Sequence, residues 1–354
     1  MKTEVLNIHP VYPELDKIDR CAKIIRQGGL VIFPTETVYG IAANFANPRA
    51  IERLRQVKKR AADKPFSVLV SQKEAIDGMS SILSTEVYKL IDEFWPGPLT
   101  VIVPAKEEGK TIGLRMPANN VALSLVREAR CPIVAPSANI EGRKPPRNLM
   151  EALKDLDGLV DVAIDSGDAE FGQESTIVDF HNTPLKIMRP GPISEENILF
   201  IAKQRVVLFV CTGNSCRSVM AEYILKKMLG QRADVRIISA GTGVFVSMGP
   251  SQDTIDILRK EEIDASMHRA QPLTKTMLKK ADLILAMTRM HRQQILELVP
   301  SVEKRVYLLK EFANISKGTE ADLDIPDPIG RSFPVYEECL LTIKESVKKI
   351  LDLI

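Results

Sequence analysis

The second half of the chain opens with the stretch Val206-Val207-Leu208-Phe209-Val210-Cys211-Thr212-Gly213-Asn214-Ser215-Cys216-Arg217-Ser218. Its first five residues are apolar and rich in β-branched side chains, which is typical of a buried strand. Residues 219–229 then show the apolar spacing of an amphipathic helix. The stretch therefore predicts a strand, a short polar loop and a helix, in that order.

The loop contains the groups that cleavage of a phosphate ester needs. Backbone N–H groups at the start of a helix bind anions, and the same positive helix end favours the thiolate form of a nearby cysteine. Five residues separate Cys211 from Arg217, which adds a guanidinium group. The alternative is a structural cysteine at a strand end. That alternative accounts for Cys211 alone, but it does not account for the whole octet 211–218.

Composition limits the classes of protein. The 354 residues are 45% hydrophobic and 27% charged, as in a soluble globular protein of two or three domains. The net charge of +2 gives no overall attraction to nucleic acid or to an anionic membrane. The sequence has no run of 18 apolar residues, and its polar N-terminal segment is unlike a signal peptide. We therefore expect no membrane partner.

The cysteines indicate a reducing compartment, and the histidines give no sign of a metal site. The five cysteines are few, odd in number and spread along the chain, so they do not form a disulfide framework. The four histidines are scattered, and none stands at zinc-ligand spacing from a cysteine. We expect a cytoplasmic protein with no structural metal ion.

In the first 190 residues, hydroxyl, amide and basic side chains recur at the ends of expected apolar strands. They are Thr35, Lys58, Arg60, Thr111, Arg115, Ser137, Asn139, Ser175 and Arg189. Such strand ends can form a concave site for an anionic ligand. Taken alone, the basic cluster at Lys58 and Arg60 is more typical of a solvated helix end. The glycine-rich phosphate loops of other nucleotide-binding proteins are missing, so separate side chains would have to hold any phosphates.

The rest of the second half alternates apolar strands with amphipathic segments. This order predicts a doubly wound α/β domain of about 150 residues with a four-stranded parallel sheet. Asp327-Pro328 lies in a proline-stiffened loop rich in aspartate. The loop is either a simple surface turn or the source of a general acid for Cys211.

Seven ordered motifs in residues 5–195 resemble those of YrdC-type threonylcarbamoyl-AMP synthase domains. The motifs are Pro34-Thr35-Glu36-Thr37-Val38-Tyr39-Gly40, Lys58-x-Arg60, Trp95-Pro96-Gly97-Pro98-Leu99-Thr100, Arg115-Met116-Pro117, Ser137-Ala138-Asn139, Ser175-Thr176-Ile177-Val178-Asp179 and Arg189-Pro190-Gly191. The resemblance implies a twisted, mostly parallel sheet around a basic concave site. It also implies that ATP, L-threonine and bicarbonate, with Mg²⁺, give threonylcarbamoyl-AMP for tRNA modification, which makes tRNA and the tRNA-modification proteins indirect partners.

The same resemblance implies roles for the strand-end residues, with Thr111 counted among those that bind ATP or threonine. Lys58 and Arg60 would hold phosphates, whereas Arg115 and Arg189 would hold a carboxylate and the nucleotide. Hydroxyl and amide side chains would orient threonine, the carbamate and the phosphates; these are Thr35, Ser137, Asn139 and Ser175. The sequence departs from the family mainly in rim loops, for example at 118–120.

Residues 205–354 resemble the low-molecular-weight protein phosphatases. The resemblance depends on residues 211–218, on Ser239-Ala240-Gly241-Thr242 and on Asp327-Pro328. It implies that Cys211 forms a phosphocysteine, that Arg217 and the loop N–H groups stabilise the transition state, and that Asp327 is the general acid. Ser218 would donate to the thiolate and Asn214 would brace the loop, which Gly213, Ser215 and Cys216 complete. No cofactor is implied, the substrate would be a phosphorylated protein, and Cys216 could form a reversible disulfide with Cys211.

Thr212 decides the expected substrate. Tyrosine-directed members usually have a bulky aliphatic residue after the nucleophile and tyrosines after Asp-Pro, where this chain has Thr212 and Ile329-Gly330. Thr212 resembles the arginine-phosphatase subgroup, so we favour phosphoarginine over phosphotyrosine. Arsenate reduction is disfavoured because a further cysteine in a mobile loop is not found.

We predict a synthase domain over residues 1–194, a linker over 195–204 and a phosphatase domain over 205–354. In an alternative of another class, the first domain is an RNA- or nucleotide-binding module that targets a protein-tyrosine phosphatase. Intact basic and hydroxyl motifs in the first domain favour the bifunctional enzyme.

Overall fold

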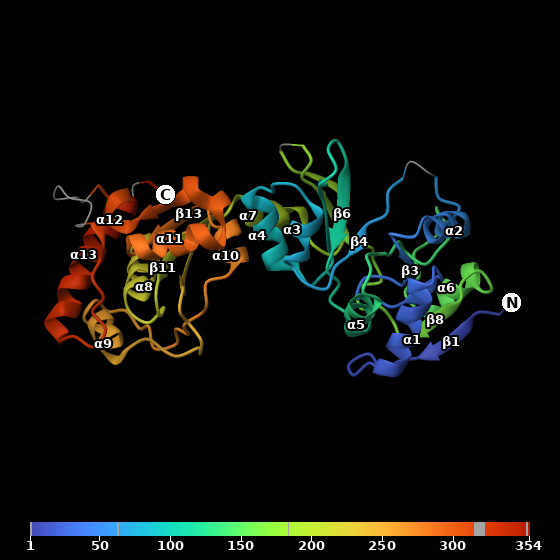
Figure 1. Ribbon diagram of the computed structural model, residues 1–354, viewed down its shortest axis with the longest axis horizontal. Coiled ribbons are helices and arrows are strands. Elements are labelled where there is room, and N and C mark those ends of the chain that lie inside the picture. The colour runs from blue at the N-terminus through green and yellow to red at the C-terminus, as the bar shows by residue number, and fades with distance from the viewer. Residues whose placement is uncertain (1, 62–63, 183, 315–322, 352) are drawn as a thin grey trace. The chain divides into compact units, whose positions relative to one another are not determined.

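The chain forms two compact units, Met1–Ala202 and Lys203–Ile354, in a computed structural model (Figure 1). The structure describes residues 2–61, 64–182, 184–314, 323–351 and 353–354. Both units are α/β, as the sequence predicts, and each is described by itself. No helix in these described ranges combines the length and apolarity needed to cross a membrane.

The first unit contains a sheet of ten strands in the order β1-β8-β2-β3-β7-β4-β6-β5-β9-β10. The strands are β1 (Glu4–Asn7), β2 (Val31–Phe33), β3 (Gly40–Asn44), β4 (Val68–Leu69), β5 (Leu99–Pro104), β6 (Thr111–Arg115), β7 (Ile133–Val134), β8 (Val162–Asp165), β9 (Thr176–Asp179) and β10 (Lys186–Arg189). Four neighbouring pairs are parallel and five are antiparallel. The sheet is therefore mixed, where the sequence led us to expect mostly parallel pairing. Connections as short as residues 105–110 between β5 and β6 allow only an antiparallel turn.

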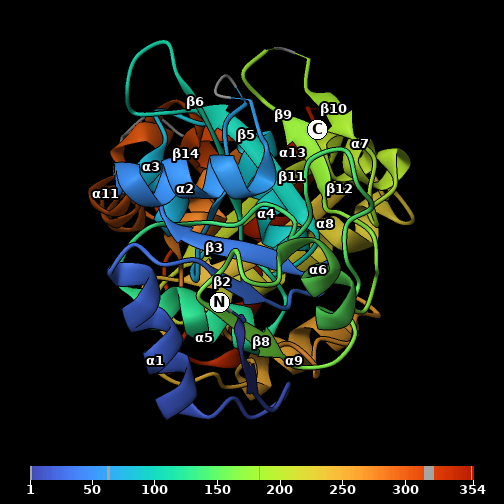
Figure 2. The ribbon, with the colours of Figure 1, turned by 90° about the vertical axis from the view of Figure 1, so that its right-hand side faces the viewer.

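Helices cover both faces of this sheet. They are α1 (Leu15–Arg26), α2 (Pro48–Lys58), α3 (Ala75–Met79), α4 (Thr85–Phe94), α5 (Asn120–Ala129), α6 (Leu149–Leu156) and α7 (Glu195–Lys203). Helices α1 and α5 lie side by side on one face (Figure 2), where they pack with Val31 and Phe33 of β2. Ile32 faces the opposite core, to which α2, α3, α4 and α6 contribute. The period-two alternation of side chains in β2 supplies both cores.

The second unit has a four-stranded, all-parallel sheet in the order β12-β11-β13-β14, as predicted. Its elements are β11 (Arg205–Cys211), α8 (Arg217–Leu229), β12 (Val235–Gly241), α9 (Gln252–Lys260), α10 (Lys275–Lys280), β13 (Leu283–Ala286), α11 (Arg289–Leu298), the 3₁₀ helix η1 (Pro300–Arg305), β14 (Val306–Leu308), α12 (Leu309–Phe312) and α13 (Phe333–Leu351). Strand β11 is central, and the chain leaves it first toward β12 and later toward β13. The carboxyl end of β11 is thus a topological switch point, where open α/β sheets bind ligands.

The opening stretch of the sequence explains why β11 is central. Val207 and Phe209 pack into the core beneath α8, α9 and α13. Val206, Leu208 and Val210 face the other core, which α10 and α11 cover. A strand that is buried on both faces needs a continuous apolar run and not an alternating one, and residues 206–210 provide it.

Helix α7 occupies the segment expected as the linker. Its Ile198 is fully buried, and Ala202 is also buried, in the first unit's core. The first unit's packing therefore continues almost to β11, and only Gln204 separates the two elements.

Replacing Ile198 by alanine tests the packing of α7. Because a cavity would form in the core, we expect the first unit to lose about 2–5 kcal/mol of unfolding free energy. Urea unfolding followed by the fluorescence of Trp95, the single tryptophan, which is buried in this unit, reports the loss. Phe200→Ala is the matched control on the same helix, because Phe200 is 45% exposed. A loss as small for Ile198→Ala as for the control would show that α7 is only a linker.

Candidate active sites

A cavity of about 740 Å³, including the open solvent at its mouth, lies in the first unit. The ends of several strands and the loops between them surround it, as the sequence analysis expects. Its lining includes Thr35, Thr37, Arg60, Thr100, Arg115, Ser137, Glu174, Ser175 and Arg189. Hydroxyls and guanidinium groups thus dominate its polar lining, and such groups recognise carboxylates and phosphates.

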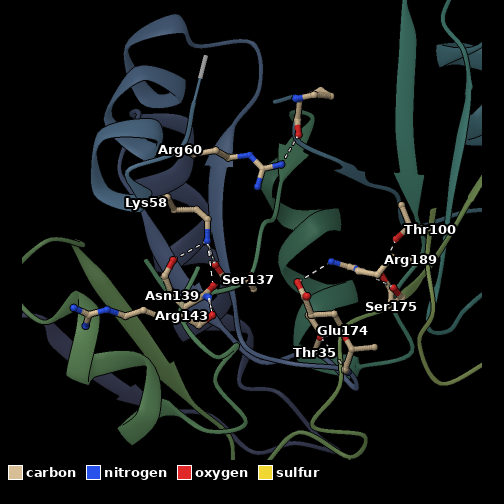
Figure 3. A network of polar contacts seen from close by, with 12 residues as sticks. Thr35, Lys58, Arg60, Thr100, Ser137, Asn139, Arg143, Glu174, Ser175 and Arg189 are labelled. Atoms are coloured by element: carbon tan, nitrogen blue, oxygen red, sulfur yellow. Dashed lines mark hydrogen bonds and ion pairs between the residues drawn. The ribbon is translucent and has the colours of Figure 1, made fainter. Parts of the chain in front are cut away.

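One side of the cavity is a cluster around Ser175 (Figure 3). Arg189 donates through Nε to the Ser175 carbonyl oxygen at 3.1 Å and through Nη2 to the Ser175 hydroxyl oxygen at 3.1 Å. The Ser175 hydroxyl also lies 2.8 Å from the Thr100 hydroxyl, and Arg189 pairs with Glu174 at 2.8 Å. Burial lowers the pKa of Arg189 from its usual value, although Glu174 opposes this. The cluster holds a half-buried guanidinium in a fixed place beside the cavity.

Arg115 projects from the end of β6 and pairs with Glu36. Its Nη2 lies 2.7 Å from Glu36 Oε1, and the two side chains are only 10% and 3% exposed. The Arg115 Nε and the Glu36 Oε2 have no partner among the described protein atoms. A buried pair with one free donor and one free acceptor can still bind a polar ligand.

Lys58 does not line the cavity. It is 2% exposed, and its ammonium donates to the carbonyl oxygens of Ser137 and Asn139 and, at 3.3 Å, to Asn139 Oδ1 (Figure 3). Burial, with help from Arg60, lowers the pKa of Lys58 to about 8. Its geometry braces the 137–139 loop and leaves the Ser137 side chain at the cavity wall.

Of the other predicted residues, some line the cavity and others do not. Arg60 lines the cavity with its guanidinium 5.1 Å from the ring centre of Phe66, and its Nη2 donates to the Pro65 carbonyl at 3.0 Å. Thr35 lines the cavity too, with its hydroxyl donating to the Val38 carbonyl at 2.7 Å. Asn139 lies behind the wall, and Thr111 is exposed at the start of β6, away from the cavity.

Four polar residues of this site were not among those predicted. They are Glu36, Thr37, Thr100 and Glu174. The first three stand within quoted motifs, and Glu174 directly precedes another. The need for a carboxylate beside each buried arginine was the signal that could have found Glu36 and Glu174.

In the second unit, the loop 211–216 joins β11 to α8, with Cys216 as the residue before the helix. Cys211 is 2% exposed, and its Sγ lies 3.0 Å from the Ser218 hydroxyl. The segment after β12 lies beside this loop, because Thr242 and Gly243 donate to the carbonyls of Cys211 and Thr212, each at 2.9 Å. The carbonyl groups of Cys211 and Thr212 are thus bonded to a neighbouring segment.

Gly241 permits that close approach. A Cβ there would lie 2.4 Å from the Thr212 carbonyl oxygen and 2.9 Å from the Asn214 nitrogen. Any side chain would therefore push the loop out of place.

Asn214 holds the loop's bend. Its φ of 50° is left-handed, which asparagine tolerates better than most residues. Its amide donates to Ser218 Oγ at 3.0 Å and to Ser239 Oγ at 2.7 Å, and its carbonyl accepts from the Gln271 backbone at 3.0 Å. Ser239 in turn donates to the buried Glu222. These bonds fix Asn214 from several elements of the second unit.

Arg217 and Asp327 are brought together across 110 positions of sequence. Arg217, 5% exposed as a side chain, pairs with Asp327 and donates to the Ile325 carbonyl at 3.0 Å. Ile325 is itself fixed by its N–H bond to the Met287 carbonyl at the end of β13. The loop that contains Asp327 therefore lies beside Arg217, where the cysteine loop meets α8.

Thr212 has a partner that the sequence analysis missed. Its hydroxyl lies 2.8 Å from His291 Nε2, and His291 is fully buried near the start of α11. Burial, followed by the charge of Arg217, lowers the pKa of His291 to about 4. Gly213 and Ser215 complete the loop, and Cys216 Sγ lies 3.3 Å from the Ser251 hydroxyl.

The first unit thus has a cavity lined by arginine and hydroxyl side chains on a mixed sheet, and the second unit has a cysteine, an arginine and an aspartate at the switch point of a parallel sheet. Residues 23–191 match the Sua5, YciO and YrdC family, described as telomere recombination, and residues 206–354 match the low molecular weight phosphotyrosine protein phosphatases. The chain belongs to the first of these families through its first unit and to the second through its second unit.

Two relatives of the first unit are named threonylcarbamoyl-AMP synthase. That of Pyrococcus abyssi is 36% identical over an alignment of 204 positions, which covers 55% of this chain and 60% of that protein. The Coxiella burnetii protein of the same name is 31% identical over 37% of this chain and 75% of its own length. The crystal structure of P. abyssi Sua5 complexed with L-threonine covers 86% of this chain and 99% of that one, at 24% identity and a TM-score of 0.54, and shows a common fold.

The Arg115–Glu36 pair generates a stability prediction. Arg115→Met leaves the Glu36 carboxylate buried without its partner, so we expect a loss of about 3–5 kcal/mol in the first unit's unfolding free energy. Adding Glu36→Gln should recover most of that loss, because a neutral amide costs less to bury. The fluorescence of Trp95 during urea unfolding measures the unfolding free energy of each variant. If the losses of the two single variants simply add in the double variant, Arg115 and Glu36 do not form a direct pair.

Proposed function

We propose that the chain is a bifunctional enzyme of the cytoplasm. The first unit would make threonylcarbamoyl-AMP from L-threonine, bicarbonate and ATP, for threonylcarbamoylation of tRNA. The second would hydrolyse phosphorylated arginine in proteins through a phosphocysteine intermediate. A reducing compartment suits the second activity, because it keeps the Cys211 thiol free.

The arginine-lined cavity carries the synthase proposal. Arg60, Arg115 and Arg189 all line it, and the substrates present several anionic groups, namely the carboxylate of threonine, bicarbonate and the phosphates. The chemistry needs no covalent nucleophile, because bringing the carbamate to the α-phosphate and neutralising charge are sufficient. The names of the P. abyssi and C. burnetii relatives support the same activity.

Magnesium would enter with ATP. The cavity contains a carboxylate, Glu174, and several hydroxyls, and these are the oxygen donors that Mg²⁺ prefers, with phosphates and water as its other ligands. When bound, the ion would neutralise part of the phosphate charge. The residues of the cavity therefore fit an ion that is shared with the nucleotide.

Pyrophosphate release tests the synthase. The full chain should release pyrophosphate only when ATP, threonine and bicarbonate are all present. Arg60→Met should lower kcat/KM for ATP by about 10–100-fold, because a charge-assisted bond to phosphate is lost. Arg53→Met is the matched control on α2, since Arg53 makes a half-exposed pair with Asp161. Nucleotide or RNA binding without pyrophosphate release would instead support the binding-module alternative.

For the second unit, the cysteine loop and its acid carry the proposal. The Cys211 thiolate, which accepts from Ser218, would attack phosphorus while Asp327 gives a proton to the leaving group. The bond from phosphorus to the leaving group breaks as the S–P bond forms, and Arg217 with the loop N–H groups would stabilise the charge. Water would then cleave the S–P bond, Asp327 would take its proton, and phosphate would leave.

Thr212 carries the choice of phosphoarginine. It is exposed next to the nucleophile, and its hydroxyl oxygen can accept a bond from a guanidinium N–H group. Ile329 and Gly330 follow Asp327-Pro328 without an aromatic ring to stack on a tyrosyl phosphate.

Phosphotyrosine is the second candidate, and Phe245 favours it. This ring is 97% exposed, and it follows the segment whose Thr242 and Gly243 bond to the cysteine loop. An exposed ring there is available to stack on an aryl phosphate.

Peptides with either phosphorylated residue decide between the two. Cys211→Ser should abolish release of phosphate from both. Thr212→Ile should lower the ratio of kcat/KM for phosphoarginine over phosphotyrosine by about tenfold, because it removes one hydrogen-bonding hydroxyl. Thr212→Ser keeps the hydroxyl and should keep the ratio. If Thr212→Ile leaves the ratio unchanged, the substrate assignment is wrong.

A further inference from the structure

His291 is a buried polar side chain without a part in the proposed chemical steps. It is 0% exposed on α11, yet both of its ring nitrogens contact a threonine hydroxyl. Nε2 lies 2.8 Å from Thr212 Oγ1, and Nδ1 lies 2.8 Å from Thr288 Oγ1. The imidazole therefore bridges the cysteine loop and the start of the helix that follows β13.

Strand pairing fixes this bridge. Val210 of β11 pairs with Ala286 of β13, and the Met287 N–H donates to the Val210 carbonyl at 3.0 Å. Thr288 then caps α11 by accepting from the His291 N–H. The strand pairing and the helix cap thus hold His291 beside the cysteine loop, with little freedom to move.

The imidazole is uncharged at neutral pH. Its pKa falls to about 4, mainly through burial and then through the positive charge of Arg217, and the carboxylates of Asp324 and Asp327 oppose that fall only in part. A neutral imidazole has one N–H and one bare nitrogen. It therefore donates to one threonine and accepts from the other, and it adds no second cation beside Arg217.

We propose that His291 is a positioning residue for substrate choice, which acts by fixing the rotamer of Thr212. The proposal rests on the phosphatase activity proposed above. An exposed threonine alone would sample more than one rotamer. The bond to His291 selects one of them and still leaves the Thr212 oxygen a lone pair for a guanidinium N–H. An aryl phosphate has no such donor, so it gains little from the fixed hydroxyl.

A purely structural role for His291 has a different signature. A satisfied core histidine would matter for stability alone, and its loss would then weaken hydrolysis of both substrate classes alike. The ratio of the two specificities therefore separates positioning from packing.

Two variants of the full chain exploit the separation of the ring nitrogens. His291→Gln can place its amide near Nε2 and keep the bond to Thr212. His291→Asn can place its amide only near Nδ1, so it keeps Thr288 and loses Thr212. We expect His291→Asn to lower the phosphoarginine-to-phosphotyrosine ratio of kcat/KM by about tenfold, and His291→Gln to stay within about threefold of wild type. Equal losses on both peptides, or the same ratio in both variants, would overturn the proposal.

A second measurement does not depend on how well those variants fold. In ¹⁵N-histidine spectra of the full chain, Thr212→Val should shift the Nε2 resonance of His291 more than its Nδ1 resonance. Unchanged resonances would refute the contact. Wild-type chain that releases phosphate from neither peptide would refute the proposed phosphatase itself, whereas an active wild type with unaltered ratios in the variants would refute only the role of His291.

Discussion

The second unit depends on a loop that bends sharply between a fully buried strand and a helix. Such a bend needs a left-handed residue, and Asn214 at φ 50° supplies it. Ser218, Ser239 and the Gln271 backbone hold the asparagine amide, so the strain of the bend is opposed by hydrogen bonds from α8, β12 and the chain beyond it. Gly241 then gives the loop the room that this conformation requires.

The first unit meets a different constraint, which is the burial of positive charge. Arg115 has Glu36, Arg189 has Glu174, and Lys58 has the carbonyls of Ser137 and Asn139. Because an unpaired buried charge is unfavourable, these partners are a condition of folding. The lysine also shows that a basic residue in a binding motif can serve the site from behind its wall.

Much of this arrangement could be predicted from the sequence, and there are physical reasons why the rest could not. The apolar run 206–210 predicts a central strand because only a strand buried on both faces tolerates it. The resemblance placed Lys58 at the phosphates, but in the structure its ammonium bonds to the carbonyls of Ser137 and Asn139 and does not line the cavity. Spacing alone could not reveal this, because it does not give the direction of a side chain at a helix end. His291 was missed because its role depends on the pairing of β11 with β13, which brings together residues 79 positions apart. Short connections in the first unit produced more antiparallel pairs than the resemblance to the synthase family implied.

The two sites share one feature of electrostatics. In each, an arginine that would bind substrate is paired with a carboxylate: Arg189 with Glu174, and Arg217 with Asp327. An incoming anion must therefore replace a carboxylate as the partner of the guanidinium. In the proposed phosphatase, this exchange would release the Asp327 side chain from its ion pair with Arg217 and leave it free to face the leaving group.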